Sequence, residues 1–237
     1  MTKGIFLTGT GTDIGKTYVA GLITKKLKEA GLTPAYYKAA MSGNERRTDG
    51  SLIPGDAAHV RSVSGISQPL EEMCPYVYEQ AYSPHLAARL EGSPVDPDVV
   101  MAGWQALVRR YDHITAEGSG GILCPIRFDP EHEIYLEHII RMLRLPSLIV
   151  ADAGLGTINS VVLTAEYMRQ RGLPVRGIIF NKWHPGDVME EDNLRMCEHL
   201  TGLPVIACVR EGDTDLDIGT DALTGLYEPI ETNGSVG

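Results

Sequence analysis

The sequence predicts an α/β fold with a mostly parallel central sheet and helices on both faces. Apolar runs of strand length alternate along the chain with segments of helical periodicity. The runs are rich in Val, Ile and Leu and show little polar alternation, as expected for parallel strands that are buried on both sides. A glycine-rich turn joins the first apolar run to the first helical segment.

The order of the elements follows from these patterns. The expected strands are residues 4–8, 34–40, 112–117, 146–152, 174–181 and 204–209. The expected helices are residues 15–30, 56–64, 83–91, 97–110, 134–144, 158–171 and 189–201. Glycines that directly follow predicted helices are Gly31, Gly172 and Gly202. Prolines at predicted strand entrances are Pro34, Pro146, Pro174 and Pro204.

Chain length, net charge, hydrophobic runs and cysteine spacing exclude several classes of protein. The 237 residues suit one domain, expected over residues 1–230, with residues 231–237 as a disordered tail. The net charge of −10 without a basic block argues against duplex nucleic acid as a partner. We expect no signal peptide, and no apolar run approaches the ~20 residues of a membrane span. The four cysteines lie far apart, so we expect reduced thiols, no zinc site and a cytoplasmic protein.

The turn after the first strand reads GTGTDIGKT from Gly9 to Thr17. Its glycines let several backbone N–H groups point at one centre, and the following helix adds its dipole. Lys16 is placed to reach the β- and γ-phosphates of a nucleotide, and the Thr17 hydroxyl to ligate Mg²⁺. The usual motif has glycine at the position of Thr10, so this loop is one residue longer. A turn without a ligand is the alternative, but the position of Gly-Lys-Thr at the strand–helix junction favours the P-loop NTPase fold.

Other polar residues follow the predicted strands at the same sheet edge, because parallel strands all end there. Lys38 is either a surface lysine of an edge strand or a second cation near the γ-phosphate, beside Ser42. Asp56 either caps a helix or ligates Mg²⁺. Glu117 ends a buried strand and precedes the glycine-rich residues 118–121, which permit close approach of a ligand.

Two further segments lie at this edge. The turn at residues 154–160 is rich in glycine and opens a helix, so its amides are suited to hold an anion. Asn181 ends the next strand and offers a donor and an acceptor on one amide, which suits the edge of a purine.

Together these segments closely resemble the dethiobiotin synthetases. The resemblance covers about residues 3–185 and rests on TGTGTDIGKT at 8–17, YKAAMSG at 37–43, GDA at 55–57, EGSGG at 117–121, GLGTIN at 154–159, and Asn181. The longer phosphate loop is a trait of this family. The resemblance implies a homodimeric ATPase fold that joins 7,8-diaminononanoate and CO₂ into a cyclic urea, through a carbamate and a carbamic-phosphoric anhydride, with ATP hydrolysis.

The resemblance also implies roles for individual residues. The expected catalytic cations are Lys16 and Lys38. The expected Mg²⁺ ligands are Thr17, Asp56 and Glu117. The expected substrate contacts are Thr12 and Ser42, with Gly156, Thr157, Ile158 and Asn159 supplied by the partner subunit. The expected nucleotide contacts are Asp13, Ile14, Gly15, Lys16, Thr17, Tyr18, Asp56, Glu117, Gly118, Ser119, Gly120, Asn181, Lys182, Arg210, Glu211 and Gly212.

This chain departs from the family pattern in one segment, and a second segment carries no motif of the family. The family often has a proline-centred loop over the base, whereas this chain has no proline between Val209 and Asp213. The segment from Cys124 to Tyr135 carries no family signal. Within it, His132, Glu133 and His138 do not form a His-Glu-x-x-His zinc motif, and we expect them to be solvated helix residues.

Two alternatives come from other functional classes. Partition-type ATPase switches carry a second lysine five residues before the conserved one, but Gly11 occupies that position here. Cobyrinate-type amide ligases share the phosphate loop and the carboxylates, but they need an additional glutaminase domain with a catalytic cysteine, for which 237 residues leave no room.

Overall fold

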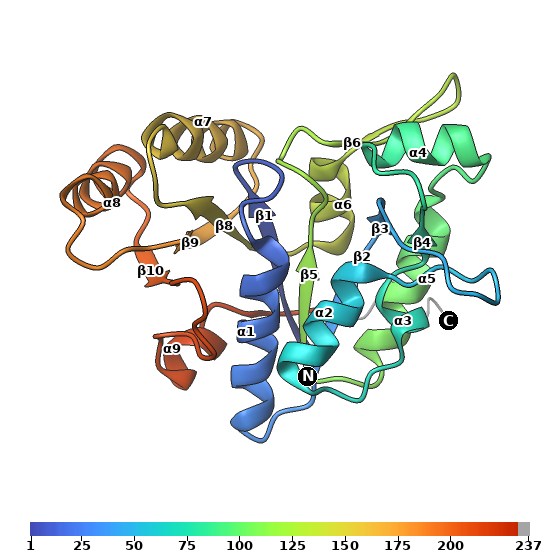
Figure 1. Cartoon of the computed structure of the whole chain (residues 1–237), viewed down its shortest axis with the longest axis horizontal. Coiled ribbons are helices and arrows are strands. Elements are labelled where there is room, and N and C mark those ends of the chain that lie inside the picture. The colour runs from blue at the N-terminus through green and yellow to red at the C-terminus, as the bar shows by residue number, and fades with distance from the viewer. Residues whose placement is uncertain (232–237) are drawn as a thin grey trace.

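The computed structural model describes residues 1–231, which build a central sheet in the strand order β10-β9-β8-β1-β5-β2 (Figure 1). These strands are parallel to one another. Their bounds are β1 Lys3–Gly9, β2 Pro34–Lys38, β5 His113–Glu117, β8 Ser147–Asp152, β9 Val175–Asn181 and β10 Val205–Cys208. A short strand, β11 (Glu228–Pro229), pairs antiparallel with the start of β1. The predicted fold class is therefore confirmed.

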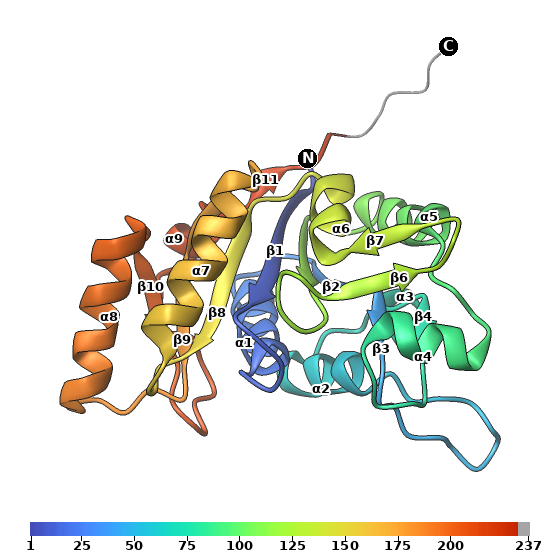
Figure 2. The same cartoon turned by 90° about the horizontal axis from the view of Figure 1, so that it is seen from above.

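Helices cover both faces of the sheet (Figure 2), and each face has its own hydrophobic core. One core holds residues of α1 (Lys16–Glu29), α2 (Gly55–Ser64), α3 (Leu70–Met73) and α9 (Thr220–Thr224). The other core holds residues of α4 (Pro84–Glu91), α5 (Pro97–Val108), α6 (Leu136–Leu143), α7 (Thr157–Gln170) and α8 (Val188–Thr201).

Successive strand residues point to opposite cores, and β2 shows this directly. Tyr36 belongs to the core beside α1, whereas Tyr37 belongs to the core beside α5. The Tyr37 hydroxyl donates to the Val100 carbonyl at 2.6 Å, and its ring lies 5.7 Å from that of Trp104. Lys38 follows at the end of the strand, so the two-residue period of a strand places it on the same side as Tyr36.

The predicted helix ends and strand entrances are confirmed. Gly31, Gly172 and Gly202 follow α1, α7 and α8 with φ of 80°, 65° and 69°, a left-handed conformation that glycine adopts without strain. Pro34 is the first residue of β2, and the other three prolines directly precede β8, β9 and β10.

The predicted strand 34–40 is interrupted. β2 ends at Lys38, and after a bend at Ala39 the chain forms β3 (Ala40–Met41), which pairs with β4 (Tyr76–Val77) outside the central sheet. The run from residue 34 to 41 contains no glycine and no polar break apart from Lys38, so hydrophobicity alone does not mark this bend.

The predicted helix 134–144 was wrong at its start. Residues 133–135 form β7 (Glu133–Tyr135), which pairs antiparallel with β6 (Pro125–Phe128), and α6 begins at Leu136. His132 and Glu133 thus lie in a hairpin rather than in a helix. His138 does lie on α6, where its Nδ1 accepts a hydrogen bond from the Tyr135 N–H at 2.9 Å. The chain passes from strand to helix without a glycine or proline, which hid the boundary.

Among the described residues, no helix has the length and apolarity needed to span a membrane. Of the predicted tail at 231–237, residues 232–237 lie outside the described part of the chain. The extent of a single domain over residues 1–230 stays a prediction.

Candidate functional site

The phosphate loop, residues 10–15, connects the end of β1 to the first residue of α1. Gly15 has a φ of 90°, and a Cβ at this position would lie 2.0 Å from Asn181 Nδ2, so no larger residue fits. Asn181 Nδ2 donates to the Ile14 carbonyl at 3.0 Å. Asn181, the last residue of β9, therefore holds the loop in place through this hydrogen bond.

Lys16 is folded into this loop and is only 6% exposed. Its Nζ donates to the Gly11 carbonyl at 2.7 Å, across the curve of the loop. Burial, followed by the nearby ammonium of Lys38, lowers the pKa of Lys16. The side chain thus presents a poorly solvated cation within the curve of the loop.

Four predicted residues from four separate elements meet beside Lys16. Lys38 Nζ donates to Asp56 Oδ2 at 2.6 Å and to Glu117 Oε1 at 2.7 Å. Thr17 Oγ1 donates to the same Glu117 oxygen at 2.9 Å. Glu117 and Lys38 are 2% and 6% exposed, so both charges are shielded from solvent. Two carboxylates, a hydroxyl and an ammonium therefore share one small volume.

The electrostatics of this group follow from its pairing. Burial disfavours the charged form of Lys38, but the Glu117 and Asp56 carboxylates outweigh that effect and raise the pKa of Lys38. Burial likewise opposes ionisation of Asp56, but Lys38 outweighs it and lowers the pKa of Asp56. The pairing thus favours the charged forms of Lys38 and Asp56.

A cavity of about 390 Å³ opens in front of these residues. Its lining joins the phosphate loop, the bend after β2, the start of α2 and the glycine segment after β5. The lining residues are Thr12, Asp13, Gly15, Lys16, Thr17, Lys38, Met41, Ser42, Asp56, Glu117, Ser119 and Gly120. Ser119 Oγ also donates to the Ala40 carbonyl at 2.7 Å, which ties the glycine segment to the bend.

The turn before α7 does not line this cavity. Gly156 and Asn159 are exposed, and Leu155 is 92% exposed. Gly156 has a φ of 91°, and the Gly154 N–H donates to Asp152 Oδ1 at 2.9 Å. Thr157 is buried, and its Oγ1 has no hydrogen-bond partner among the described residues. Within one chain, the predicted substrate residues 156–159 thus stand apart from Thr12 and Ser42.

The predicted base-binding residues also lie outside this cavity. Arg210, Glu211 and Gly212 are exposed, and the Arg210 guanidinium pairs with Asp213 Oδ1 at 2.9 Å. The Tyr18 hydroxyl donates to the Asp213 carbonyl, which holds this turn against α1. Lys182 pairs with Asp152 Oδ2 at 2.9 Å. Ile14, Gly118 and Asn181 likewise do not line the cavity.

Sequence reasoning missed Tyr36. Its hydroxyl donates to the second oxygen of Glu117, Oε2, at 2.9 Å, and its side chain is fully buried. Burial, followed by the charge of Glu117, raises the pKa of Tyr36 well above its usual value, so the hydroxyl stays a donor. The two-residue period of a strand was the available signal, because Tyr36 lies on the same face as Lys38.

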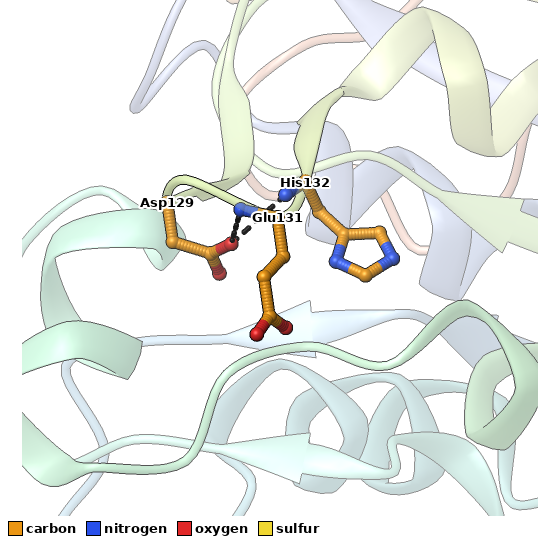
Figure 3. A group of neighbouring side chains, drawn as sticks. All are labelled: Asp129, Glu131 and His132. Atoms are coloured by element: carbon orange, nitrogen blue, oxygen red, sulfur yellow. Dashed lines mark hydrogen bonds between the residues drawn. The ribbon is translucent and has the colours of Figure 1, made fainter.

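A second group of metal-type side chains lies at the tip of the β6–β7 hairpin. Ligand atoms of Asp129, Glu131 and His132 lie within 4.8 Å of one another (Figure 3). Asp129 Oδ1 accepts from the backbone N–H groups of Glu131 and His132, each at 2.9 Å. Arg127 Nε donates to the other Asp129 oxygen at 2.5 Å. These bonds account for the cluster as a stabilised turn.

Comparison with known proteins identifies the family. The sequence profile described as an AAA domain matches residues 3–214. The ATP-dependent dethiobiotin synthetase of Brachyspira hyodysenteriae is 49% identical over 217 residues, which are 92% of this chain and 96% of the relative. That of Clostridium botulinum strain Loch Maree is 42% identical over 230 residues, or 97% of this chain and all of the relative. The chain belongs to the dethiobiotin synthetase family.

Membership in the dethiobiotin synthetase family confirms the resemblance drawn from the motifs between the phosphate loop and Asn181. Solved structures support the fold alone. The signal recognition particle protein of Aeropyrum pernix has a TM-score of 0.56 at 15% identity and covers 95% of this chain and 48% of its own. A ParA family ATPase from Chlorobium tepidum has a TM-score of 0.55 at 12% identity, covering 94% of this chain and 88% of its own.

Proposed function

We propose that this chain forms dethiobiotin from 7,8-diaminononanoate, CO₂ and ATP, with release of ADP and phosphate, as a cyclo-ligase of biotin biosynthesis. The observation that carries the proposal is the convergence of Lys16 and Lys38 with three oxygen-bearing residues on the cavity that Ser42 also lines. The names of the full-length relatives agree with this activity.

The bond changes follow in three steps. One amine of the substrate attacks CO₂ and loses a proton, which gives a carbamate. A carbamate oxygen attacks the γ-phosphorus, ADP leaves, and a carbamic-phosphoric anhydride results. The second amine attacks the anhydride carbonyl, loses a proton and expels phosphate as the ring closes. None of these steps needs a protein nucleophile, so the protein acts by positioning and by offsetting charge.

Lys16 and Lys38 are the proposed catalytic cations. Lys16 lies within the phosphate loop, where its ammonium offsets charge on the β- and γ-phosphates. Lys38 lies at the end of β2 and lines the same cavity as that loop and Ser42, so we assign it to the transferring phosphoryl group. Thr12 and Ser42 are the proposed hydrogen-bond partners of the carbamate, because both line the same cavity. Asp13, Gly15, Ser119 and Gly120 line the same cavity and are proposed as further contacts of the phosphates.

The residues present fit a Mg²⁺ ion. Thr17, Asp56 and Glu117 offer a hydroxyl and two carboxylates within one small volume, and oxygen ligands are those that Mg²⁺ prefers. When bound, Mg²⁺ would supply positive charge that offsets the charge of the phosphates. Asp56 and Glu117 would hold it with their carboxylates, and Thr17 with the hydroxyl at the start of α1.

We also propose that the enzyme is a homodimer with composite substrate sites. An apolar groove of about 450 Å³ runs between α7 and residues 121–123 and reaches Thr10 of the phosphate loop. Leu123 and Leu163 on this face are 58% and 62% exposed. In such a dimer, the backbone amides of the partner's residues 156–159 would meet the substrate carboxylate.

For the base of ATP we propose contacts with Tyr18, Asn181, Lys182 and the turn at Arg210, Glu211 and Gly212. The Tyr18 bond to Asp213 supports this placement, because it brings that turn next to the start of α1. A cytoplasmic location is consistent with the four free cysteines.

Product analysis of the purified protein tests the function. With diaminononanoate, bicarbonate, Mg²⁺ and ATP, we expect ADP and dethiobiotin in equal amounts, measured by coupled assay and mass spectrometry. Reactions without the diamine, or with ammonia as the acceptor, are the controls. ADP release that does not depend on the diamine would contradict the proposal and favour an ATPase switch or an amide ligase.

A further inference from the structure

We propose that Tyr36 is a positioning residue for Glu117: its hydroxyl fixes the carboxylate so that one oxygen stays directed at the metal and phosphate site. This inference rests on the metal role of Glu117 given under the proposed function. It concerns a residue that none of the motifs includes.

The two oxygens of Glu117 have different surroundings. Oε1 accepts from Thr17 and Lys38, both of which line the cavity. Oε2 accepts from the Tyr36 hydroxyl, whose residue is fully buried and does not line the cavity. The torsion at the end of a glutamate side chain is broad on its own. A donor on Oε2 therefore sets the plane of the carboxylate and leaves Oε1 as the oxygen that faces the ligand.

Thr17 and Lys38 cannot serve this purpose in the catalytic state. Both are assigned to the nucleotide complex themselves, Thr17 as a metal ligand and Lys38 as a cation on the phosphoryl group. Tyr36 is assigned no contact with the nucleotide or the metal, because its hydroxyl meets the other oxygen of Glu117, Oε2. It is thus the contact of Glu117 that remains unchanged while the other two exchange partners.

Tyr36 is itself held in place from the open edge of the sheet. β2 is the last strand, so one side of its backbone has no neighbouring strand. There Gln68 Oε1 accepts from the Tyr36 N–H at 2.8 Å, and Gln68 Nε2 donates to the Tyr36 carbonyl at 3.0 Å. Gln68 is 1% exposed, so this amide replaces the missing strand at Tyr36. The backbone that carries the Tyr36 side chain is therefore held in a fixed position.

The next residue provides a matched control. Tyr37 is also buried, and its hydroxyl donates to a backbone carbonyl, that of Val100, on the opposite face of the sheet. Tyr36→Phe and Tyr37→Phe thus remove the same atom from the same strand at equal depth. Only the first removes a bond to Glu117.

The experiment measures metal binding directly. Mn²⁺ is titrated into each protein with a non-hydrolysable ATP analogue and followed by electron paramagnetic resonance. We expect Tyr36→Phe to bind Mn²⁺ about 10- to 100-fold more weakly, the range expected when a group that orients a metal ligand is lost. Tyr37→Phe is expected to bind Mn²⁺ as the parent does. Both variants should lose thermal stability to a similar degree.

A double variant distinguishes a specific effect on Glu117 from a general loss of structure. In Glu117→Gln the carboxylate is gone, so adding Tyr36→Phe should not weaken Mn²⁺ binding further. Equal Mn²⁺ affinity of Tyr36→Phe and Tyr37→Phe, or additive losses in the double variant, would overturn the inference. Dethiobiotin formation by the parent is measured separately. Its absence would remove the proposed function, while the Mn²⁺ comparison would still decide the role of Tyr36.

Discussion

Lys38 and Glu117 occupy facing positions in the register of two neighbouring parallel strands, β2 and β5, and their charged atoms lie 2.7 Å apart. Both side chains are almost fully buried at the strand ends. Removing either partner leaves the other charge buried with fewer partners, which is costly in a protein interior. The sheet register thus fixes the spacing between the proposed phosphoryl cation and a proposed metal ligand.

Lys38→Ala is expected to lower kcat by about 10²- to 10³-fold, or about 2.7–4 kcal/mol, as when one preorganised donor is lost from a transition state. Steady-state assays of ADP release measure this, with circular dichroism as the check on folding. Lys26→Ala is the control, because Lys26 pairs with Asp215 in the last turn of α1 and does not line the cavity. Normal turnover in a folded Lys38→Ala protein would remove Lys38 from the mechanism.

Glu117→Gln keeps the shape of the side chain but removes its charge. The Mg²⁺ concentration for half-maximal turnover is expected to rise by more than about 10-fold, because a neutral amide is a weaker ligand and Lys38 then pairs with Asp56 alone. The measurement is a Mg²⁺ titration of the initial rate at saturating ATP. An unchanged titration curve would show that the ligand set is wrong.

Much of the site could be predicted from sequence because its residues follow strands of one parallel sheet. Lys16, Lys38, Asp56 and Glu117 come from distant segments, yet the rule that parallel strands end at one edge brings them together. The phosphate loop located the site, because the spacing of its glycines and of Lys16 is specific. What remained unpredicted depends on contacts across the sheet rather than on local pattern.

Tyr36 and the β6–β7 hairpin illustrate the missing information. Tyr36 reads as an ordinary buried aromatic residue. The strand period places it on the same face as Lys38, but only the three-dimensional structure shows that its hydroxyl donates to Glu117. The hairpin strands are four and three residues long, too short for periodicity to distinguish them from the start of α6. The separation of residues 156–159 from the cavity is likewise a matter of three-dimensional placement.

Acid stability is expected to report on Asp56. Because its pKa is lowered in the folded protein, the folded state is stabilised above the usual pKa of 3.8, and this stabilisation is lost as the pH falls through the lower folded value. Asp56→Asn lacks this contribution. The difference in Tm between parent and variant should therefore shrink as the pH is lowered from 6 to 3. Parallel curves over this range would contradict the pairing with Lys38.

Gly15→Ala is expected to disrupt the phosphate loop. A Cβ there would lie 2.0 Å from Asn181 Nδ2, and the φ of 90° costs a side chain on the order of 1–2 kcal/mol by itself. Gly11→Ala is the control, since a Cβ at Gly11 meets no atom within 4 Å. We expect a lower Tm and weaker ATP binding by calorimetry for Gly15→Ala. Equal values for the two variants would mean that Asn181 does not brace the loop.

The composite-site proposal predicts a specific loss at Gly156. Gly156→Leu should weaken diaminononanoate binding more than ATP binding, because the turn before α7 lies outside the cavity of its own chain. Gly172→Leu is the matched control: it also has a positive φ, of 65°, with no atom within 4 Å of an added Cβ, but it lies at the other end of α7. Calorimetric titration with each ligand separates the two effects.

Mixing two inactive variants provides the decisive test of a shared site. A Lys38→Ala subunit retains an intact turn at Gly156, and a Gly156→Leu subunit retains an intact Lys38. In a hybrid dimer, one of the two composite sites then has both features. Refolding the variants together should restore up to about one quarter of parental activity, since half of the dimers are hybrids and each has one working site. Full activity in a species that sediments as a monomer would refute the shared site and leave the phosphate and magnesium proposals standing.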